Sequence, residues 1–271
     1  MVSSVRSTEL TVLDQIIVRK RAEFLAEQAL QPLAELERIP RPTRRSFRQA
    51  LASRKPAIIS EIKKASPSAG VIASDFNPAR IGRSYERAGA AALSVLTDRQ
   101  FFQGSLDDLR QARAATSLPV LRKDFTLERY HLVQAAAAGA DAVLLIVAAL
   151  TDGEIETLLA EARELQLDAL VEVHNEQELS RALGAGADLV GVNNRNLKTL
   201  EVSLETSLKL AELMPPDVLA VSESGIRTAD DIRRLMEAGF QAFLIGESLM
   251  KQPDPGAALT ALVEGTRHAS A

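Results

Sequence analysis

Four stretches of the sequence follow one plan: RAGAAALSVLTD at 87–98, AAGADAVLLIVA at 137–148, GAGADLVGVNNR at 184–195 and EAGFQAFLIGES at 237–248. Each begins with the end of a predicted helix, continues through a glycine and a few small or polar residues, and enters an apolar strand. A glycine just past a helix readily takes the left-handed conformation that ends it. Short joints of this kind connect the helices and strands of repeated βα units.

Eight apolar runs have the unbroken hydrophobicity of parallel strands that are covered on both faces. They lie at 58–63, 93–97, 120–123, 142–147, 169–173, 189–193, 219–223 and 243–246. Helix starts are predicted between them at Asn77-Pro78, at Asn175 with Glu178, and at Thr228 with Asp231. We therefore predict a (β/α)8 TIM barrel. An open doubly wound sheet is the alternative, but it rarely needs eight such even repeats, and no GxGxxG or P-loop follows the first strand.

Residues 1–50 precede the predicted barrel and form an N-terminal helical extension. We expect an amphipathic helix over 10–28 and a short second helix over 46–53. The length of 271 residues suits one large α/β domain, so we predict a single domain over 1–271 with the extension as a lid or buttress. The end of the extension carries a basic cluster of Arg41, Arg44, Arg45, Arg48, Arg54 and Lys55. We interpret this cluster as a solvated face, and less readily as a surface that attracts an anionic ligand toward the barrel mouth.

Composition narrows the function further. A net charge of −4 argues against a nucleic-acid partner, and the absence of cysteine excludes disulfides, thiol nucleophiles and zinc–thiolate sites. We expect no signal peptide and no membrane helix, because the longest apolar run, 142–150, is too short. We therefore expect a cytoplasmic protein. Glu172 and His174 have ligand-like spacing, but no second histidine joins them, so we predict no metal site.

Polar side chains interrupt the apolar strands near their C-terminal ends. The alternation of a strand places Glu61 with Lys63 on one face, and it turns four further polar residues toward the same mouth: Lys123, Glu172, Asn193 and Glu223. Any one of them alone is best explained as a surface charge or a structural ion pair. Together they indicate a site, because buried ions need partners and barrel enzymes place their chemistry at this face. Acid and lysine groups suit general acid–base catalysis.

Two loops after the last strands have the form of a phosphate site. SESGI at 222–226 and IGESL at 245–249 offer the backbone N–H groups of Gly225, Ile226, Gly246 and Glu247. Phosphate sites after the seventh and eighth strands recur in this fold. The Glu247 side chain must then point away from the bound phosphate.

Six motifs in order resemble the indole-3-glycerol phosphate synthase family over essentially the whole chain: SEIKKASPSAG (60–70), LRKDF (121–125), LVEVHN (170–175), GVNNRNL (191–197), SESGI and FLIGESLM (243–250). The resemblance implies the substrate 1-(2-carboxyphenylamino)-1-deoxyribulose 5-phosphate. It also implies the products indole-3-glycerol phosphate, CO₂ and water, formed without a metal or organic cofactor. The expected partner is thus a phosphorylated small molecule, and we expect a monomer.

The resemblance also implies catalytic roles. Lys123 is expected to be the general acid that protonates the ribulose carbonyl during ring closure, and Glu172 to take part in the acid–base work. Glu61 and Lys63 are expected to contact the substrate and assist the final dehydration. The proton transfers of that last step are left open among Glu61, Lys63 and Glu172.

Binding roles follow from the same resemblance. Polar contacts to the carboxylate or sugar hydroxyls are expected from Asn193, Arg195 and Glu223, and phosphate contacts from Ser224, Gly225 and Gly246. Glu247 occupies a position that is serine in some relatives. The walls around the aromatic ring and its carboxylate are expected to be Ser66, Pro67, Phe125, Leu144 and Leu197.

Two other functions stay open from the sequence. A Schiff-base aldolase would use Lys123 as a nucleophile, which requires the neutral amine, whereas neighbouring carboxylates favour the charged form. A phosphate-binding barrel without catalytic activity is the second, and the complete set of acid, base and phosphate residues argues against it.

Overall fold

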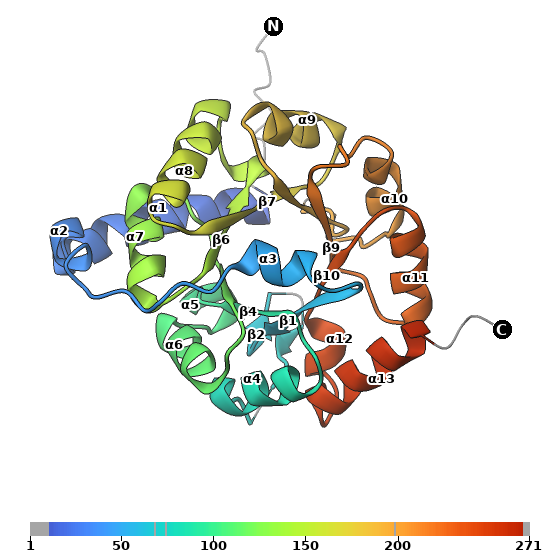
Figure 1. Cartoon of the computed structure of the whole chain (residues 1–271). Coiled ribbons are helices and arrows are strands. Elements are labelled where there is room, and N and C mark those ends of the chain that lie inside the picture. The colour runs from blue at the N-terminus through green and yellow to red at the C-terminus, as the bar shows by residue number, and fades with distance from the viewer. Residues whose placement is uncertain (1–10, 68, 74, 198, 268–271) are drawn as a thin grey trace, which may run out of the picture.

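Eight parallel strands close into a barrel in the computed structural model, which describes residues 11–67, 69–73, 75–197 and 199–267. The barrel closes where the first strand pairs with the last, Ala57 opposite Ala242 (Figure 1). This confirms the predicted (β/α)8 fold. In chain order the strands are β1 (Ala57–Ile62), β4 (Ala92–Leu96), β5 (Val120–Lys123), β6 (Ala142–Ile146), β7 (Asp168–Val173), β8 (Leu189–Asn193), β9 (Leu219–Glu223) and β10 (Ala242–Ile245).

Helices surround the barrel, as repeated βα units require (Figure 1). The outer ring consists of α4 (Pro78–Arg87), α6 (Leu106–Ala115), α7 (Arg129–Ala138), α8 (Asp152–Glu164), α9 (Glu176–Gly184), α10 (Glu205–Ala211), α11 (Ala229–Glu237) and α13 (Pro255–Arg267). Shorter helical turns lie in the loops that follow strands: α5 (Arg99–Phe102), η1 (Val147–Ala149) and α12 (Glu247–Met250).

The helix starts read from the sequence are largely confirmed. Asn77 caps α4, and Thr228 and Asp231 form a capping box on α11. Asn175 caps α9 through the N–H of Glu178, but the Glu178 carboxylate does not return to the backbone N–H of Asn175. It accepts hydrogen bonds from the backbone N–H of His174 and the side-chain amide of Asn175 instead.

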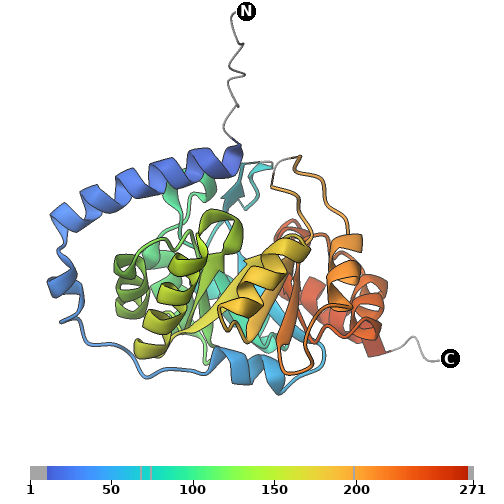
Figure 2. The same ribbon diagram turned by 90° about the horizontal axis from the view of Figure 1, so that it is seen from above.

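The N-terminal extension reaches both ends of the barrel. Its helices are α1 (Val12–Leu30), α2 (Leu33–Leu36) and α3 (Phe47–Ala52); residues 1–10 lie outside the described residues. Figure 2 shows α1 across one end of the barrel and α3 across the other. Phe47 and Leu51 of α3 are fully buried in the cluster that fills the barrel interior, so α3 closes its base.

The basic cluster of the extension lies at this base, not at the mouth. Arg44 pairs with Asp168 at the start of β7, and Arg48 pairs with Asp188 just before β8. Arg45 donates to the Leu118 carbonyl oxygen at 2.7 Å. The interpretation that this cluster attracts an anion toward the barrel mouth is therefore wrong. Since these arginines bind the N-terminal ends of the strands, a freely solvated face is also an incomplete description.

Helix α1 is confirmed, but its predicted amphipathic character is wrong. Only Ile16 and Lys20 are buried along its 19 residues. Val18 and Leu25 are exposed, at 62% and 65% of their surface. The helix is held by a buried charge as well as by apolar contacts, which a hydrophobic pattern does not reveal.

Candidate active site

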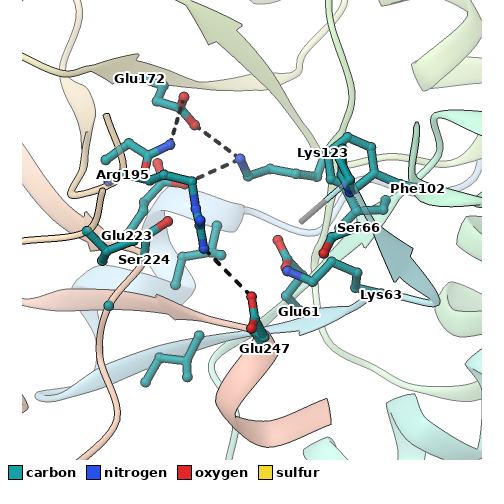
Figure 3. Close-up of a pocket in the computed structure, with 18 of the residues that line it drawn as sticks. Glu61, Lys63, Ser66, Phe102, Lys123, Glu172, Arg195, Glu223, Ser224 and Glu247 are labelled. Carbon is teal, nitrogen blue, oxygen red and sulfur yellow. Dashed lines mark hydrogen bonds and ion pairs between the residues drawn. The ribbon is translucent and has the colours of Figure 1, made fainter. Parts of the chain in front are cut away.

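A cavity of about 800 Å³ opens at the C-terminal ends of the strands (Figure 3), and Val12, Leu13 and Ile16 of α1 form part of its lining. Every site residue predicted from the sequence lines it, from Glu61 on β1 to Glu247 on α12. The strand order explains this convergence, because parallel strands bring their C-terminal ends to one face of a barrel. The predicted set is therefore brought together in space, while the role of each residue is a separate question.

Lys123 is the centre of the charged network. Its Nζ lies 3.1 Å from Glu172 Oε2 and 3.5 Å from Glu223 Oε2 (Figure 3). Burial alone would lower the pKa of Lys123, but the charges of Glu172, Glu223 and Glu61 outweigh it and raise the pKa above its ordinary value. The amine is thus held as an ammonium ion with carboxylates on several sides.

Glu172 and Glu223 contact the same lysine but differ in their other partners. Glu172 also accepts from Asn193 Nδ2 at 3.1 Å, and its Oε1 lies 3.3 Å from His174 Nε2. Burial opposes its charge, yet Lys123 and these further contacts lower the pKa of Glu172. One oxygen of Glu223 is buried without a hydrogen-bond partner. Burial and repulsion from Glu172 and Glu61 raise the pKa of Glu223 to about 7 despite Lys123.

Two glycines make room for the carboxylates. A Cβ on Gly191 of β8 would overlap the Glu223 carboxylate, and a Cβ on Gly246 would overlap the Glu61 side chain. Any larger residue at either position would displace an acid from the mouth. Gly191 of GVNNRNL and Gly246 of FLIGESLM thus leave the space that the Glu223 and Glu61 side chains occupy in the site.

Glu61 and Lys63 form one wall of the cavity. Glu61 Oε1 lies 2.8 Å from Lys63 Nζ, and both side chains are largely buried. Lys63 follows β1 directly. The predicted loop beyond it forms a small hairpin of β2 (Ala65–Ser66) and β3 (Gly70–Val71), which presents Ser66 and Pro67 to the cavity. Ser68 in this loop lies outside the described residues.

The two loops predicted to bind phosphate lie side by side. Ser248 Oγ donates to the Ile226 carbonyl oxygen at 3.1 Å, which ties the loop after β9 to the loop after β10. Ser224 and Gly225 take positive φ angles of 66° and 81°. Left-handed backbone of this kind is uncommon for serine and recurs at ligand-binding turns.

Glu247 differs from its expected orientation. Its carboxylate lies 3.7 Å from Arg195 Nη2 and 2.6 Å from Lys251 Nζ, on the cavity side of the loop (Figure 3). The sequence-based condition that this side chain points away from the phosphate loops is therefore not met. Lys251 first, and Lys63 and Arg195 as well, lower the pKa of Glu247, so it is an anion beside the proposed anion site.

Sequence reasoning missed part of the cavity wall. Leu13 and Ile16 of α1 and Phe102 of α5 line it together with the predicted apolar residues. Phe102 could have been noted as an aromatic residue in a loop after a strand. No pattern marks the α1 residues, because the docking of that helix is a tertiary feature. In the described part of the chain, no group of three or more acidic or histidine side chains is arranged to hold a metal ion.

The sequence profile of the family described as indole-3-glycerol phosphate synthase matches residues 13–262. The chain belongs to this family. An indole-3-glycerol phosphate synthase of Albidiferax ferrireducens is 51% identical over 93% of this chain and 97% of its own. Another, of Acinetobacter baumannii, is 50% identical over 93% of this chain and 95% of its own. The family indicated by the motifs is confirmed, and with it a carboxy-lyase of tryptophan biosynthesis.

Solved structures outside the indole-3-glycerol phosphate synthase family share the fold. A thiamine phosphate pyrophosphorylase from Pyrococcus furiosus is similar with a TM-score of 0.58 and 18% identity, over 80% of this chain and 98% of its own. A mandelate oxidase variant with an FMN adduct has a TM-score of 0.61 and 18% identity, over 79% of this chain and 73% of its own. At such identities the likeness concerns the barrel alone. None of the described helices is both long and apolar enough to cross a membrane.

Proposed function

We propose that this chain closes the indole ring of 1-(2-carboxyphenylamino)-1-deoxyribulose 5-phosphate, with loss of CO₂ and water, to give indole-3-glycerol phosphate. The observation that carries the proposal is the charged Lys123, surrounded by carboxylates at the base of an apolar-walled cavity. A charged lysine donates a proton, whereas a lysine that forms a Schiff base must be neutral.

Binding of the substrate requires separate places for two anions and an aromatic ring. The phosphate is assigned to the backbone N–H groups of the paired loops, near Gly225 and Gly246, with Arg195 and Lys63 supplying positive charge. The aromatic ring is assigned to the apolar walls formed by Phe125, Leu144 and Leu197. Ser66 and Pro67 are assigned to the ring carboxylate.

Ring closure uses Lys123 as the general acid. The ring carbon that bears the carboxylate attacks the ribulose carbonyl carbon, and Lys123 gives its proton to the carbonyl oxygen. The C–C bond to the carboxylate then breaks, and its electron pair restores the conjugation of the ring as CO₂ leaves. Lys123 regains a proton from water, which supplies the proton that the overall reaction consumes.

Dehydration requires one group that accepts a proton and one that donates a proton. Glu172 is ionised and therefore suited to accept the proton from the carbon of the new five-membered ring that lies between the nitrogen and the hydroxyl-bearing carbon. Lys63, paired with Glu61 at 2.8 Å, is suited to protonate the leaving hydroxyl. These assignments narrow the choice that the sequence left open among Glu61, Lys63 and Glu172.

The proposal requires no second subunit, because all the groups named above come from one chain. We accordingly propose that the protein acts as a monomer on a phosphorylated small molecule, in the cytoplasm. A size-exclusion and light-scattering measurement tests the first statement. A dimer whose interface covers the cavity mouth would contradict it.

The test is turnover of the proposed substrate, followed by the fluorescence of the indole product. Wild-type protein is expected to produce it, and Lys123→Ala is expected to lower kcat by roughly 10²–10⁴-fold, the usual contribution of a positioned acid. Lys209→Ala, an exposed lysine on α10, is the matched control and is expected to keep wild-type activity. Near wild-type turnover by Lys123→Ala would remove Lys123 from this role. Covalent trapping of substrate on Lys123 by borohydride would favour the aldolase instead.

A further inference from the structure

A row of alternating charges runs from the start of α9 to the cavity. Glu178 at the third position of α9 lies 3.0 Å from His174 Nδ1, and His174 Nε2 lies 3.3 Å from Glu172 Oε1. Glu172 Oε2 in turn lies 3.1 Å from Lys123 Nζ. The cavity is lined by Glu172 and Lys123, but His174 and Glu178 are not among the described residues that line it.

The two neighbouring carboxylates favour the charged form of His174. Nδ1 lies within hydrogen-bond distance of Glu178 Oε2, whereas Nε2 lies 3.3 Å from Glu172 Oε1 as a charge contact without a hydrogen bond. A carboxylate oxygen only accepts hydrogen bonds. A neutral imidazole would turn one of its own lone pairs toward such an oxygen, whereas an imidazolium presents N–H on both sides. Burial alone would lower the pKa of His174, but Glu172 and Glu178 outweigh it and raise the pKa to about 10.

We propose that His174 and Glu178 are a positioning pair that holds the Glu172 carboxylate ionised and oriented toward Lys123. The inference rests on the proposed function for its kinetic consequences, because Glu172 is there assigned to the acid–base work. Asn193 donates to Glu172 Oε1, and the His174 ring lies 3.3 Å from the same oxygen as a charge contact, which leaves Oε2 for the lysine. Glu178 restrains His174 through the ring and through its backbone N–H at 2.9 Å.

The charged groups around the pair come from several elements, and all of them enter the expected pH behaviour. They are Glu172 on β7, Glu178 on α9, Lys123 on β5 and Glu223 on β9. Replacement of His174 by a neutral residue removes one positive charge from this buried cluster. The proton affinity of Glu172 and its neighbour Glu223 then rises, because an opposite charge that favoured the ionised forms is lost.

The first test observes His174 directly and needs no turnover. Long-range ¹H–¹⁵N correlation spectra of the labelled protein can assign the three histidines of the chain. We expect both nitrogens of His174 to be protonated at pH 8 in the wild type. Glu178→Gln is expected to bring its titration down toward pH 7, while the exposed neighbour Glu176→Gln leaves it unchanged. A neutral His174 ring at pH 8 in the wild type would overturn the proposal.

The second test is kinetic. His174→Gln is expected to lower kcat roughly tenfold, the size of one lost charge-assisted contact, with KM within about threefold of wild type. The acid limb of the kcat–pH profile is expected to move to higher pH. Glu178→Gln should show the same changes more weakly, and Glu176→Gln none. A merely structural role would lower stability without moving the pH profile, and an unchanged profile in both variants would contradict the inference.

The two tests separate the inference from the proposed function. If the protein fails to turn over the carboxyphenylamino substrate, the spectra still report whether the positioning pair exists. If turnover is observed and His174 is neutral, the proposed function is supported and the positioning pair is contradicted.

Discussion

At the residue scale, Glu247 places an anion beside the loops assigned to a dianionic phosphate. Its carboxylate lies 3.7 Å from Arg195 Nη2, a cation that the phosphate needs. If phosphate binds at these loops as proposed, the Glu247 side chain competes with it for the positive charge of Arg195. Both residues are about 30% exposed, so the competition is partly screened by solvent and its effect is modest.

The Glu247→Ser variant tests this competition. It keeps the backbone N–H and releases Arg195, so KM for the substrate is expected to fall about two- to fivefold. Inorganic phosphate should also become a stronger competitive inhibitor. Glu212→Ser, which removes an exposed carboxylate at the end of α10, is the control for the change in net charge. A rise in KM for Glu247→Ser would show instead that the carboxylate aids binding.

At the residue scale, the sequence correctly predicted the side chains whose orientation follows from the two-residue period of a strand. Alternation along LVEVHN and SESGI predicted that Glu172 and Glu223 face the mouth, and they do. The sequence could not predict their different proton affinities, because these depend on how many partners each carboxylate finds across the barrel. The contact between His174 and Glu178 was equally hidden, since a capping pattern does not tell which N–H groups the acid accepts from.

At the scale of an element, a buried lysine of α1 anchors this helix over the cavity, in addition to its apolar contacts. Lys20 Nζ lies 2.9 Å from Asp98 and 2.9 Å from Asp124, just beyond β4 and β5. Asp124 is further bound by Arg122 and Thr97, and Lys123 lies between Arg122 and Asp124 in sequence. Docking of α1 is thus linked to the strand end that carries the proposed general acid.

The Lys20→Met variant is expected to lower the free energy of unfolding by about 3 kcal/mol, because it leaves two buried carboxylates without one of their cations. It is also expected to increase proteolytic cleavage within α1. Arg19→Met, an exposed neighbour that pairs with Glu23 of the same helix, should change stability by less than about 0.5 kcal/mol. Urea unfolding and limited proteolysis measure both. Equal stability of the two variants would show that α1 is held by its apolar contacts alone.

The helix α1 was predicted from the sequence, but the side on which it docks was not. Hydrophobic periodicity finds a buried face only when that face is apolar, and here Lys20 is buried while Val18 and Leu25 are exposed. Helix α3 was also predicted as a short helix. Its place at the base of the barrel depends on Phe47 entering the barrel interior, which local pattern does not encode.

At the scale of the whole molecule, stability and chemistry lie at opposite ends of the barrel. Phe47 is fully buried at the base, and the cavity opens at the other end. The Phe47→Ala variant is therefore expected to lose about 3–5 kcal/mol of stability. Its kcat/KM, measured well below its unfolding temperature, should stay within about twofold of wild type. A large loss of kcat/KM in protein that is still folded would show that the two ends are coupled.

The barrel itself was the most predictable feature, because four helix-to-strand joints repeat one glycine pattern and eight apolar runs are spaced evenly along the chain. The apolar runs gave the number and order of the strands, and β5, β8 and β9 have the predicted bounds. The ends of β1 and β10 differ by a residue at each side. Their pairing joins segments far apart in the chain, and no local signal sets its register.

That closure has a consequence for the protein during its synthesis. Glu61 fits against Gly246, so an acid on the first barrel strand receives its place from a residue that directly follows the last barrel strand. A nascent chain that has not yet released β10 from the ribosome has neither the second phosphate loop nor a partner for that edge of β1. Unpaired strand edges are prone to aggregate. Catalytic competence therefore arises only after β10 has been synthesised and has paired with β1, and a product that ends before β10 lacks the closed barrel.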